Sequence, residues 1–190
     1  MALRNTHKTF GSVAKFFHWL IAILVIGMLC VGASLSYIPS GATKTLIIQA
    51  HKSTGVTVLI LMILSLLWRQ INPHPVFPNT MKKWEKLLAR WVHWLLYLAV
   101  IAMPISGIVM SYAAGYPIKL WWIYPLNLPW IPQNKTLATF ANSAHGYIAV
   151  TIVALVILHT LGALKHLFIS KDGIFQRMWP GGNKPRNFFR

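Results

Sequence analysis

The chain has 190 residues, of which 56% are hydrophobic and only 11% are charged, and its formal net charge is +16. Because a soluble domain has about 25% charged residues, this composition argues against an ordinary soluble protein and indicates a membrane protein. The single cysteine, Cys30, excludes a disulfide within the chain, and its apolar surroundings in the sequence predict a buried packing role.

Four apolar stretches are each long enough to cross the hydrocarbon core, which needs about 20 residues. They lie at about residues 13–36, 46–68, 91–112 and 145–168. No room is left for a separate soluble domain, so we expect residues 1–190 to form a single membrane-embedded domain. The predicted fold is all-α, a bundle of four transmembrane helices. Residues 113–144, rich in proline and tryptophan, are expected to form an interfacial loop.

The distribution of basic residues predicts the orientation of this bundle. With four spans both termini lie on one side, and the opposite side holds only four of the 18 Lys and Arg residues: Lys44, Lys52, Lys119 and Lys135. The positive-inside rule therefore makes both termini cytoplasmic. The only two acids, Glu85 and Asp172, also fall on the cytoplasmic side. The outer face thus carries four lysines and no carboxylate side chain.

The first three segments each carry a histidine near one end. The first runs outward with His18 about one turn into it, and Gly32 helps to give it a side of small residues that a flat cofactor can approach. The second returns from the outer surface and begins near His51. The third starts inside with His93 near its inner end, and Pro104 predicts a kink.

The fourth segment carries two histidines, His145 and His159, fourteen residues apart. At 100° per residue this spacing returns to within about 40°, so both imidazoles lie on one helix face, roughly 21 Å apart along the axis. Helix direction pairs His145 with His51 on the outer side, and His159 with His18 on the inner side. Ionisable side chains within a membrane are costly and usually functional. Two histidine pairs at different depths suit bis-imidazole coordination of b-type haem.

Two further histidines leave alternatives open. His93 lies at the inner depth and can replace His18 or His159 as a ligand, although we favour a hydrogen-bonding role beside the inner haem. His166 follows His159 by seven residues, which places it on the same face about 10 Å nearer the cytoplasm. There it either contacts a quinone headgroup or simply lies among the lipid headgroups.

The histidine motifs resemble those of the bacterial cytochrome b561 family, small four-helix membrane proteins with two haems. The resemblance covers nearly the whole chain and rests on residues 17–19, 51–55, 93–97, 104–107, 144–146, 159, 166 and 171–173. It implies two haem b groups, with His18 and His159 as axial iron ligands of the cytoplasmic haem and His51 and His145 as those of the periplasmic haem. Ser65 stands where family members often have an arginine.

The resemblance also implies transmembrane electron transfer in the bacterial inner membrane. One branch of the family looks like superoxide oxidase, which oxidises superoxide outside and reduces ubiquinone in the membrane. His166 falls where that branch has a histidine near the quinone. The four outer lysines, unopposed by acids, are expected to attract an anion such as superoxide. Lys52, adjacent to the predicted ligand His51, is the best single candidate for this steering.

Two other functions remain open at this point. The chain can be a b-type cytochrome subunit that passes electrons between quinone and a partner dehydrogenase or hydrogenase, docked through residues 113–144. It can also be a haem-free membrane transporter, although the sequence contains no inverted repeat. The expected partners are the lipid bilayer, a quinone, superoxide or another small electron donor, and a redox protein, but not nucleic acid.

Overall fold

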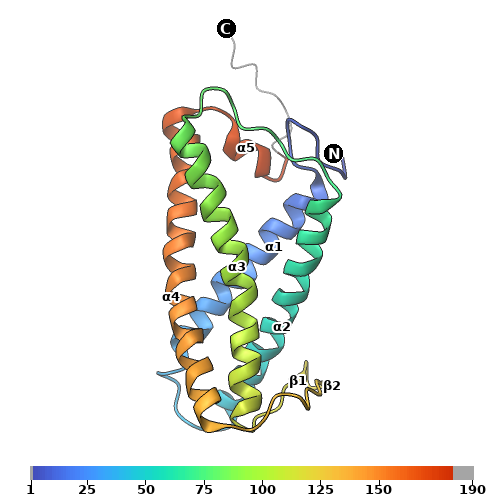
Figure 1. The fold of residues 1–190 in the computed structure, drawn as a ribbon, viewed down its shortest axis with the longest axis vertical. Coiled ribbons are helices and arrows are strands. Elements are labelled where there is room, and N and C mark those ends of the chain that lie inside the picture. The colour runs from blue at the N-terminus through green and yellow to red at the C-terminus, as the bar shows by residue number, and fades with distance from the viewer. Residues whose placement is uncertain (1, 182–190) are drawn as a thin grey trace.

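A computed structural model describes residues 2–181, which form a bundle of four long helices (Figure 1). These are α1 (Ser12–Ser34), α2 (Ala42–Gln70), α3 (Lys83–Ala113) and α4 (Lys135–Lys165). Each is long and apolar enough to cross a membrane, with α4 continued by the π-helical turn η1 (His166–Ser170). The all-α four-helix membrane fold predicted from the sequence is therefore confirmed.

Two helices start well before the apolar stretches that predicted them. α3 begins at Lys83 rather than near residue 91, and the Glu85 carboxylate accepts a hydrogen bond from the Lys82 backbone N–H at 2.9 Å. α4 begins at Lys135 rather than near residue 145, and the Asn134 side chain accepts from the Leu137 N–H at 2.9 Å. Residues 135–144 are thus helix, and the prediction of a loop there is wrong. Hydropathy locates the hydrocarbon-spanning part of a helix, whereas capping side chains decide where the helix starts.

The outer surface of the bundle is apolar. Ile23, Leu98 and Val150, all in the middle of their helices, are 66%, 66% and 71% exposed. Contiguous apolar surface of this kind is what a lipid bilayer covers, so the chain is a multi-pass membrane protein. The same packing explains why Cys30, expected to be buried, is instead exposed on α1. An apolar residue in a small membrane bundle faces lipid as readily as it faces another helix.

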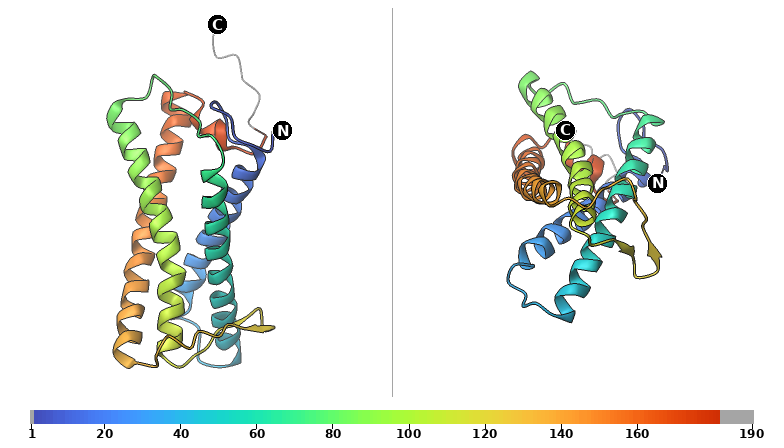
Figure 2. Two further views of the ribbon diagram at one scale, coloured as in Figure 1. Left: turned by 45° about the vertical axis from the view of Figure 1, so that its right-hand side comes forward. Right: turned by 60° about the horizontal axis from the view of Figure 1, so that its bottom comes forward.

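The buried core occupies the middle of the bundle. It is built from α2, α3 and α4 by Val58, Met62, Ala99, Val100, Ile152 and Leu155. Apolar side chains of α1, including Leu24 and Val25, pack against it. α3 and α4 run side by side, and α1 crosses the bundle obliquely (Figures 1 and 2). Along α4, Ile152 lies halfway between His145 and His159, so the core separates the two histidine depths.

Both ends of the described chain lie at one end of the bundle, here called the terminal end (Figure 1). It comprises residues 2–11, the segment 71–82, η1 and the short helix α5 (Ile174–Met178). The Asn5 side-chain amide donates to the Pro73 carbonyl at 3.1 Å. Lys15 Nζ and Trp19 Nε1 donate to the carbonyls of Trp179 and Met178 at 3.1 and 2.9 Å. Of the basic residues assigned to this side, Lys184, Arg186 and Arg190 lie outside the described residues.

The opposite end, here called the hairpin end, holds residues 35–41 and 114–134. A two-stranded antiparallel ribbon pairs β1 (Lys119–Leu120) with β2 (Tyr124–Pro125). The turn between them places Trp121 and Trp122 at φ 48° and 62°, in the left-handed region. The Ser53 hydroxyl accepts a hydrogen bond from the Trp121 N–H at 3.0 Å, and Gln49 donates to the Lys119 carbonyl. These bonds from α2 hold the hairpin over the start of that helix.

Candidate functional site

At the terminal end, α1 and α4 bring His18 and His159 together. Their ring centroids are 6.1 Å apart, and the ring planes are inclined at 58°. An imidazole nitrogen binds a first-row metal at about 2 Å and the ring centre lies about 1 Å further, so two imidazoles on opposite sides of one metal have centroids about 6 Å apart. The spacing of this pair therefore suits a shared metal centre.

His93 of α3 adjoins the same pair but differs in geometry. Its ring centroid lies 5.0 Å from that of His159, edge to face at 89°. That distance is shorter than the spacing of two imidazoles across one metal. Its Nδ1 also lies 2.5 Å from the Ala89 carbonyl oxygen, which makes Nδ1 the donor. The geometry therefore favours the hydrogen-bonding role for His93 over replacement of His18 as the partner of His159.

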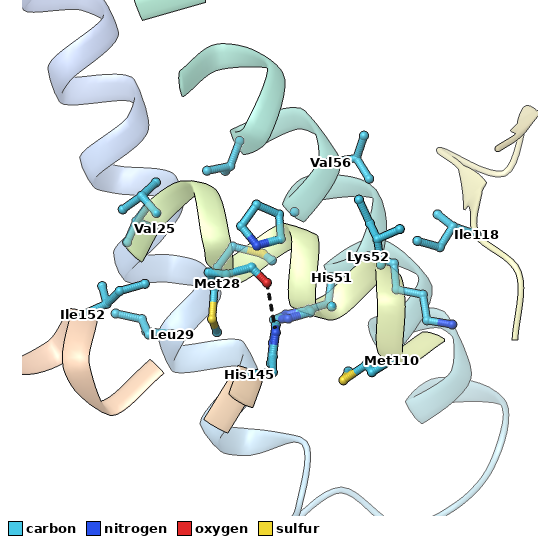
Figure 3. Close-up of a pocket in the computed structure, with 17 residues that line it drawn as sticks. Val25, Met28, Leu29, His51, Lys52, Val56, Met110, Ile118, His145 and Ile152 are labelled. Carbon is cyan, nitrogen blue, oxygen red and sulfur yellow. Dashed lines mark hydrogen bonds between the residues drawn. The ribbon is translucent and has the colours of Figure 1, made fainter. Parts of the chain in front are cut away.

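At the hairpin end, α2 and α4 bring His51 and His145 together. Their ring centroids are 6.4 Å apart, inclined at 69° (Figure 3). His145 Nδ1 lies 3.0 Å from the Met103 carbonyl oxygen and 3.0 Å from the Ser106 hydroxyl. Donation from Nδ1 to that carbonyl fixes the neutral tautomer and leaves Nε2 free to bind a metal. His51 Nδ1 is buried and has no hydrogen-bond partner among residues 2–181.

Two glycines make room for the hairpin-end pair. A Cβ added at Gly107 on α3 would lie 3.1 Å from His145 Cε1, and one added at Gly32 on α1 would lie 3.5 Å from His51 Cε1. The small-residue side expected of the first helix therefore contacts a predicted ligand. Between the two histidines lies an apolar pocket, lined by residues that include Val25, Met28, Leu29, Val56 and Ile152 (Figure 3).

All four lysines predicted for the outer face lie at the hairpin end, although two of them make local contacts. Lys52 lines the pocket of the hairpin-end pair, donates to the Tyr116 carbonyl at 3.4 Å, and lies 5.8 Å from the centre of the Tyr116 ring. Lys44 donates to the Ile38 carbonyl at 3.0 Å. Lys119 begins the hairpin and Lys135 begins α4. Both acidic residues of the chain lie at the terminal end (Figure 1), Glu85 in the first turn of α3 and Asp172 after η1.

Comparison with known proteins decides which family this arrangement represents. Residues 9–181 match the family described as prokaryotic cytochrome b561. The chain belongs to the prokaryotic cytochrome b561 family. It is 36% identical over 183 residues to cytochrome b561 homolog 2 of Escherichia coli K12, covering 94% of this chain and 95% of that one. It is 30% identical over 175 residues to the probable superoxide oxidase CybB of Yersinia pestis, covering 92% and 97%.

Membership of the cytochrome b561 family implies haem b, and the residues described above fit it. A haem held by two imidazoles needs a metal-binding nitrogen from each ring, apolar side chains around it, and small residues that leave space beside the rings. The two pairs supply the nitrogens at the spacing required, and the unpartnered His51 Nδ1 has lost water without gaining a protein partner. Family membership also supports transmembrane electron transfer and an oxidoreductase, rather than a haem-free transporter.

His166 is buried at the terminal end of the bundle. It is only 8% exposed, so it does not rest among lipid headgroups. Its Nδ1 lies 2.7 Å from Asp172 Oδ2, and the neighbouring Lys165 forms an ion pair with Glu85. Sequence reasoning placed both acids on one side but missed these pairings. The signal in the sequence was the position of each acid near basic residues, because a carboxylate that becomes buried is nearly always paired.

Arg69 of α2 contacts Tyr97 of α3 near the terminal-end histidines. Its Nη1 donates to the Tyr97 hydroxyl at 3.3 Å, and its guanidinium lies 5.5 Å from the centre of the same ring. The Tyr97 ring centroid is in turn 6.4 Å from that of His93. Arg69 therefore brings a positive charge from α2 towards the terminal-end histidines. It lies one turn after Ser65, the position at which the resemblance led us to expect an arginine.

Proposed function

We propose that the chain is a single domain of a bacterial inner membrane that carries electrons through two haem b groups. Superoxide is oxidised at the hairpin end, which faces the periplasm, and ubiquinone is reduced at the terminal end, with both chain termini in the cytoplasm. The observation that carries the proposal is the presence of two histidine pairs, with centroid spacings of 6.1 and 6.4 Å, on opposite sides of the apolar core.

In this proposal His18 and His159 hold the iron of one haem, and His51 and His145 hold that of the other. Haem b, when bound, supplies one-electron redox chemistry. The protein contributes position and environment. Met103 and Ser106 orient His145, Gly32 and Gly107 leave room beside the outer pair, and the apolar core keeps water from the space between the pairs.

The charges at the hairpin end support an anionic electron donor. Four lysines with no carboxylate side chain near them create a positive field that raises the local concentration of an anion. Two superoxide ions each lose one electron and leave as O₂, and ubiquinone takes up two electrons and two protons to become ubiquinol. Lys52 is the steering residue with the closest approach to the site, because it lines the same pocket as His51 and His145. The relative named a probable superoxide oxidase supports this donor.

The hairpin also supports a second candidate, a cytochrome subunit that serves a partner redox protein. Trp121, Trp122, Ile123 and Tyr124 are between 45% and 82% exposed at the tip of the ribbon. Exposed aromatic residues are typical both of membrane interfaces and of protein docking sites. In this candidate, electrons enter from a docked dehydrogenase or hydrogenase rather than from superoxide.

The deciding experiment uses the purified protein alone. A reduced-minus-oxidised spectrum with a haem count should give two haem b per chain. Anaerobic addition of superoxide should then reduce the haems, and ubiquinone should reoxidise them with formation of ubiquinol. A count of one or none would overturn the two-haem proposal. Haems that ubiquinone reoxidises but that superoxide does not reduce would favour the partner subunit.

A further inference from the structure

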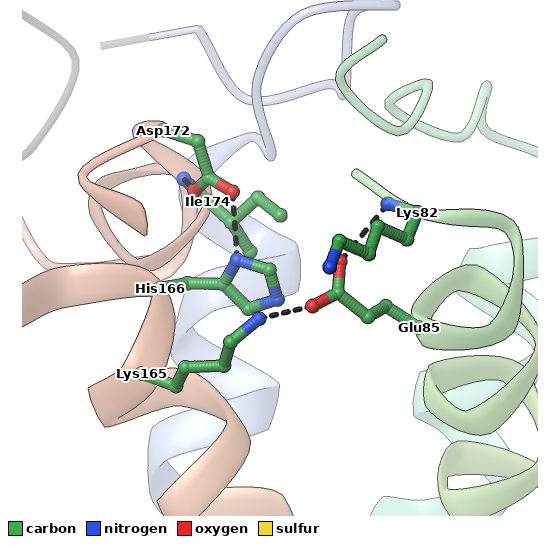
Figure 4. A network of polar contacts seen from close by, with 6 residues as sticks. All are labelled: Lys82, Glu85, Lys165, His166, Asp172 and Ile174. Atoms are coloured by element: carbon green, nitrogen blue, oxygen red, sulfur yellow. Dashed lines mark hydrogen bonds and ion pairs between the residues drawn. The ribbon is translucent and has the colours of Figure 1, made fainter. Parts of the chain in front are cut away.

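The two acidic residues of the whole chain, Glu85 and Asp172, meet in one polar cluster at the terminal end (Figure 4). Glu85 comes from the first turn of α3, and Asp172 follows η1. Between them lie Lys165 and His166, the last residue of α4 and the first of η1. Both carboxylate side chains of the chain therefore lie in one cluster with a buried histidine.

The Asp172 carboxylate orients His166. Its Oδ2 lies 2.7 Å from His166 Nδ1, and the two side chains are only 10% and 6% exposed. A carboxylate can only accept here, so Nδ1 is the donor and, in the neutral ring, Nε2 carries a free lone pair. The second oxygen, Oδ1, accepts from the Ile174 N–H at 3.2 Å, which fixes the carboxylate at the start of α5.

The other edge of the His166 ring faces the ion pair of Lys165 and Glu85 (Figure 4). A polar cleft of about 230 Å³ lies beside this ion pair and reaches Asp172, and its lining residues include Thr80, Lys82, Glu85, Lys165, Ser170 and Asp172. A water molecule needs about 10–15 Å³ of such space and several polar partners, so the cleft can hold a short chain of waters.

We propose that His166 and Asp172 form a proton-transfer pair that delivers protons from water in this cleft to a quinone reduced at the terminal end. The inference rests on the proposed function, because that function consumes two protons for each quinone. A proton from the cytoplasmic solvent, relayed by water in the cleft, is taken up at Nε2, and the Asp172 carboxylate stabilises the resulting imidazolium. Nε2 then releases the proton to the quinone oxygen, while the electrons arrive separately. His166 is the proton carrier, and Asp172 is the residue that positions it.

The competing explanation is that the cluster only clamps α3 to α4 and η1. The variant Asp172→Asn separates the two, because its side-chain oxygen can still accept from the Ile174 N–H while the negative charge is lost. Glu85→Gln is the matched control, since it breaks the ion pair with Lys165 but leaves the His166–Asp172 pair in place. Protein whose haems have been reduced chemically is mixed with a short-chain ubiquinone in H₂O and in D₂O, so that superoxide is not needed.

For Asp172→Asn we expect quinone reduction to slow by about tenfold or more, the lower range for loss of a general acid–base group. The solvent isotope effect should rise, and small weak acids such as imidazole should restore part of the rate, while haem content stays that of the wild type. In ¹⁵N-histidine NMR spectra without quinone, the His166 resonance, assigned with His166→Gln, should show the Nδ1–H tautomer only when Asp172 is present.

Several outcomes would overturn the proposal. One is an Asp172→Asn protein that reduces quinone with the wild-type rate and isotope effect. Another is an equal loss of rate in Asp172→Asn and Glu85→Gln that weak acids do not restore, which would show that the cluster only holds α3 to α4 and η1. If the chemically reduced wild-type protein does not reduce ubiquinone at all, both the proposed quinone reaction and the proton-transfer role are wrong. Quinone reduction that is intact in the wild type and unchanged in Asp172→Asn would remove only the proton-transfer pair.

Discussion

Gly107 of α3 lies directly against the imidazole of His145 of α4, so closely that a methyl group in its place would come within 3.1 Å of Cε1. The same ring is oriented by the Met103 carbonyl, one turn earlier on α3. One helix therefore both aligns this histidine and leaves the space that it occupies. Gly107 thus contacts a predicted metal ligand, and hydropathy alone gives no sign of this role.

Gly107→Ala should displace His145 and weaken the haem site at the hairpin end. A contact near 3.1 Å forces either the ring or the helix to move by a few tenths of an ångström. We expect haem content to fall towards half of the wild-type value, or the spectrum of one haem to shift. Gly27→Ala is the control, because a Cβ there meets nothing within 4 Å among the described residues. Equal haem loss in both variants would mean that bundle packing, rather than the His145 contact, is responsible.

Removal of one ligand from each pair should remove one haem. His51→Ala and His159→Ala are each expected to lower the haem content by about half, because a lost axial imidazole leaves a single weak attachment. His93→Leu should keep both haems, since His93 Nδ1 bonds to its own helix and its ring lies too near His159 to share a metal with it. A pyridine haemochrome assay measures these ratios. Loss of a haem in His93→Leu would reassign the terminal-end ligands.

Lys52→Gln should slow the reaction with superoxide but not with a neutral donor. An electrostatic enhancement of about ten- to thousandfold, shared among four lysines, corresponds to about a two- to fivefold loss for one of them. The rate of the variant with superoxide should also depend less on ionic strength than that of the wild type. Lys83→Gln is the control, because Lys83 is an exposed lysine at the terminal end. If both variants, or neither, change the rate measured by pulse radiolysis, local steering by Lys52 is wrong.

Asn134→Ala should destabilise the folded protein by about 1 kcal/mol, the usual loss for an N-cap residue. The Asn134 side chain accepts from the Leu137 N–H at 2.9 Å and so starts α4 well before its apolar part. Asn134→Asp should keep most of the stability, because a carboxylate accepts the same bond at a helix N-terminus. Thermal unfolding in detergent measures the change. Equal stability of the alanine and wild-type proteins would show that α4 needs no cap at this position.

The sequence by itself was sufficient for the class of fold and the pairing of the main histidines. Long apolar stretches predict spans because the bilayer requires internally satisfied backbone hydrogen bonds. Fourteen residues between His145 and His159 fix their common face and their separation in depth, because helix geometry is regular. With the direction of each span known, His51 and His18 were the partners at matching depths, and the structure brings each pair of rings within 6.4 Å.

Only the tertiary structure decided the contacts that depend on how helices rotate and where they end. It set His93 beside His159, Gly107 against His145 and Cys30 on the surface, because rotation about a helix axis is fixed by packing and not by hydropathy. The positions of the side chains after α4 could not be predicted from α-helical periodicity, because η1 is a π-helical turn. There His166 is buried against Asp172, while the neighbouring Lys165 pairs with Glu85, so both acids of the chain lie in one cluster.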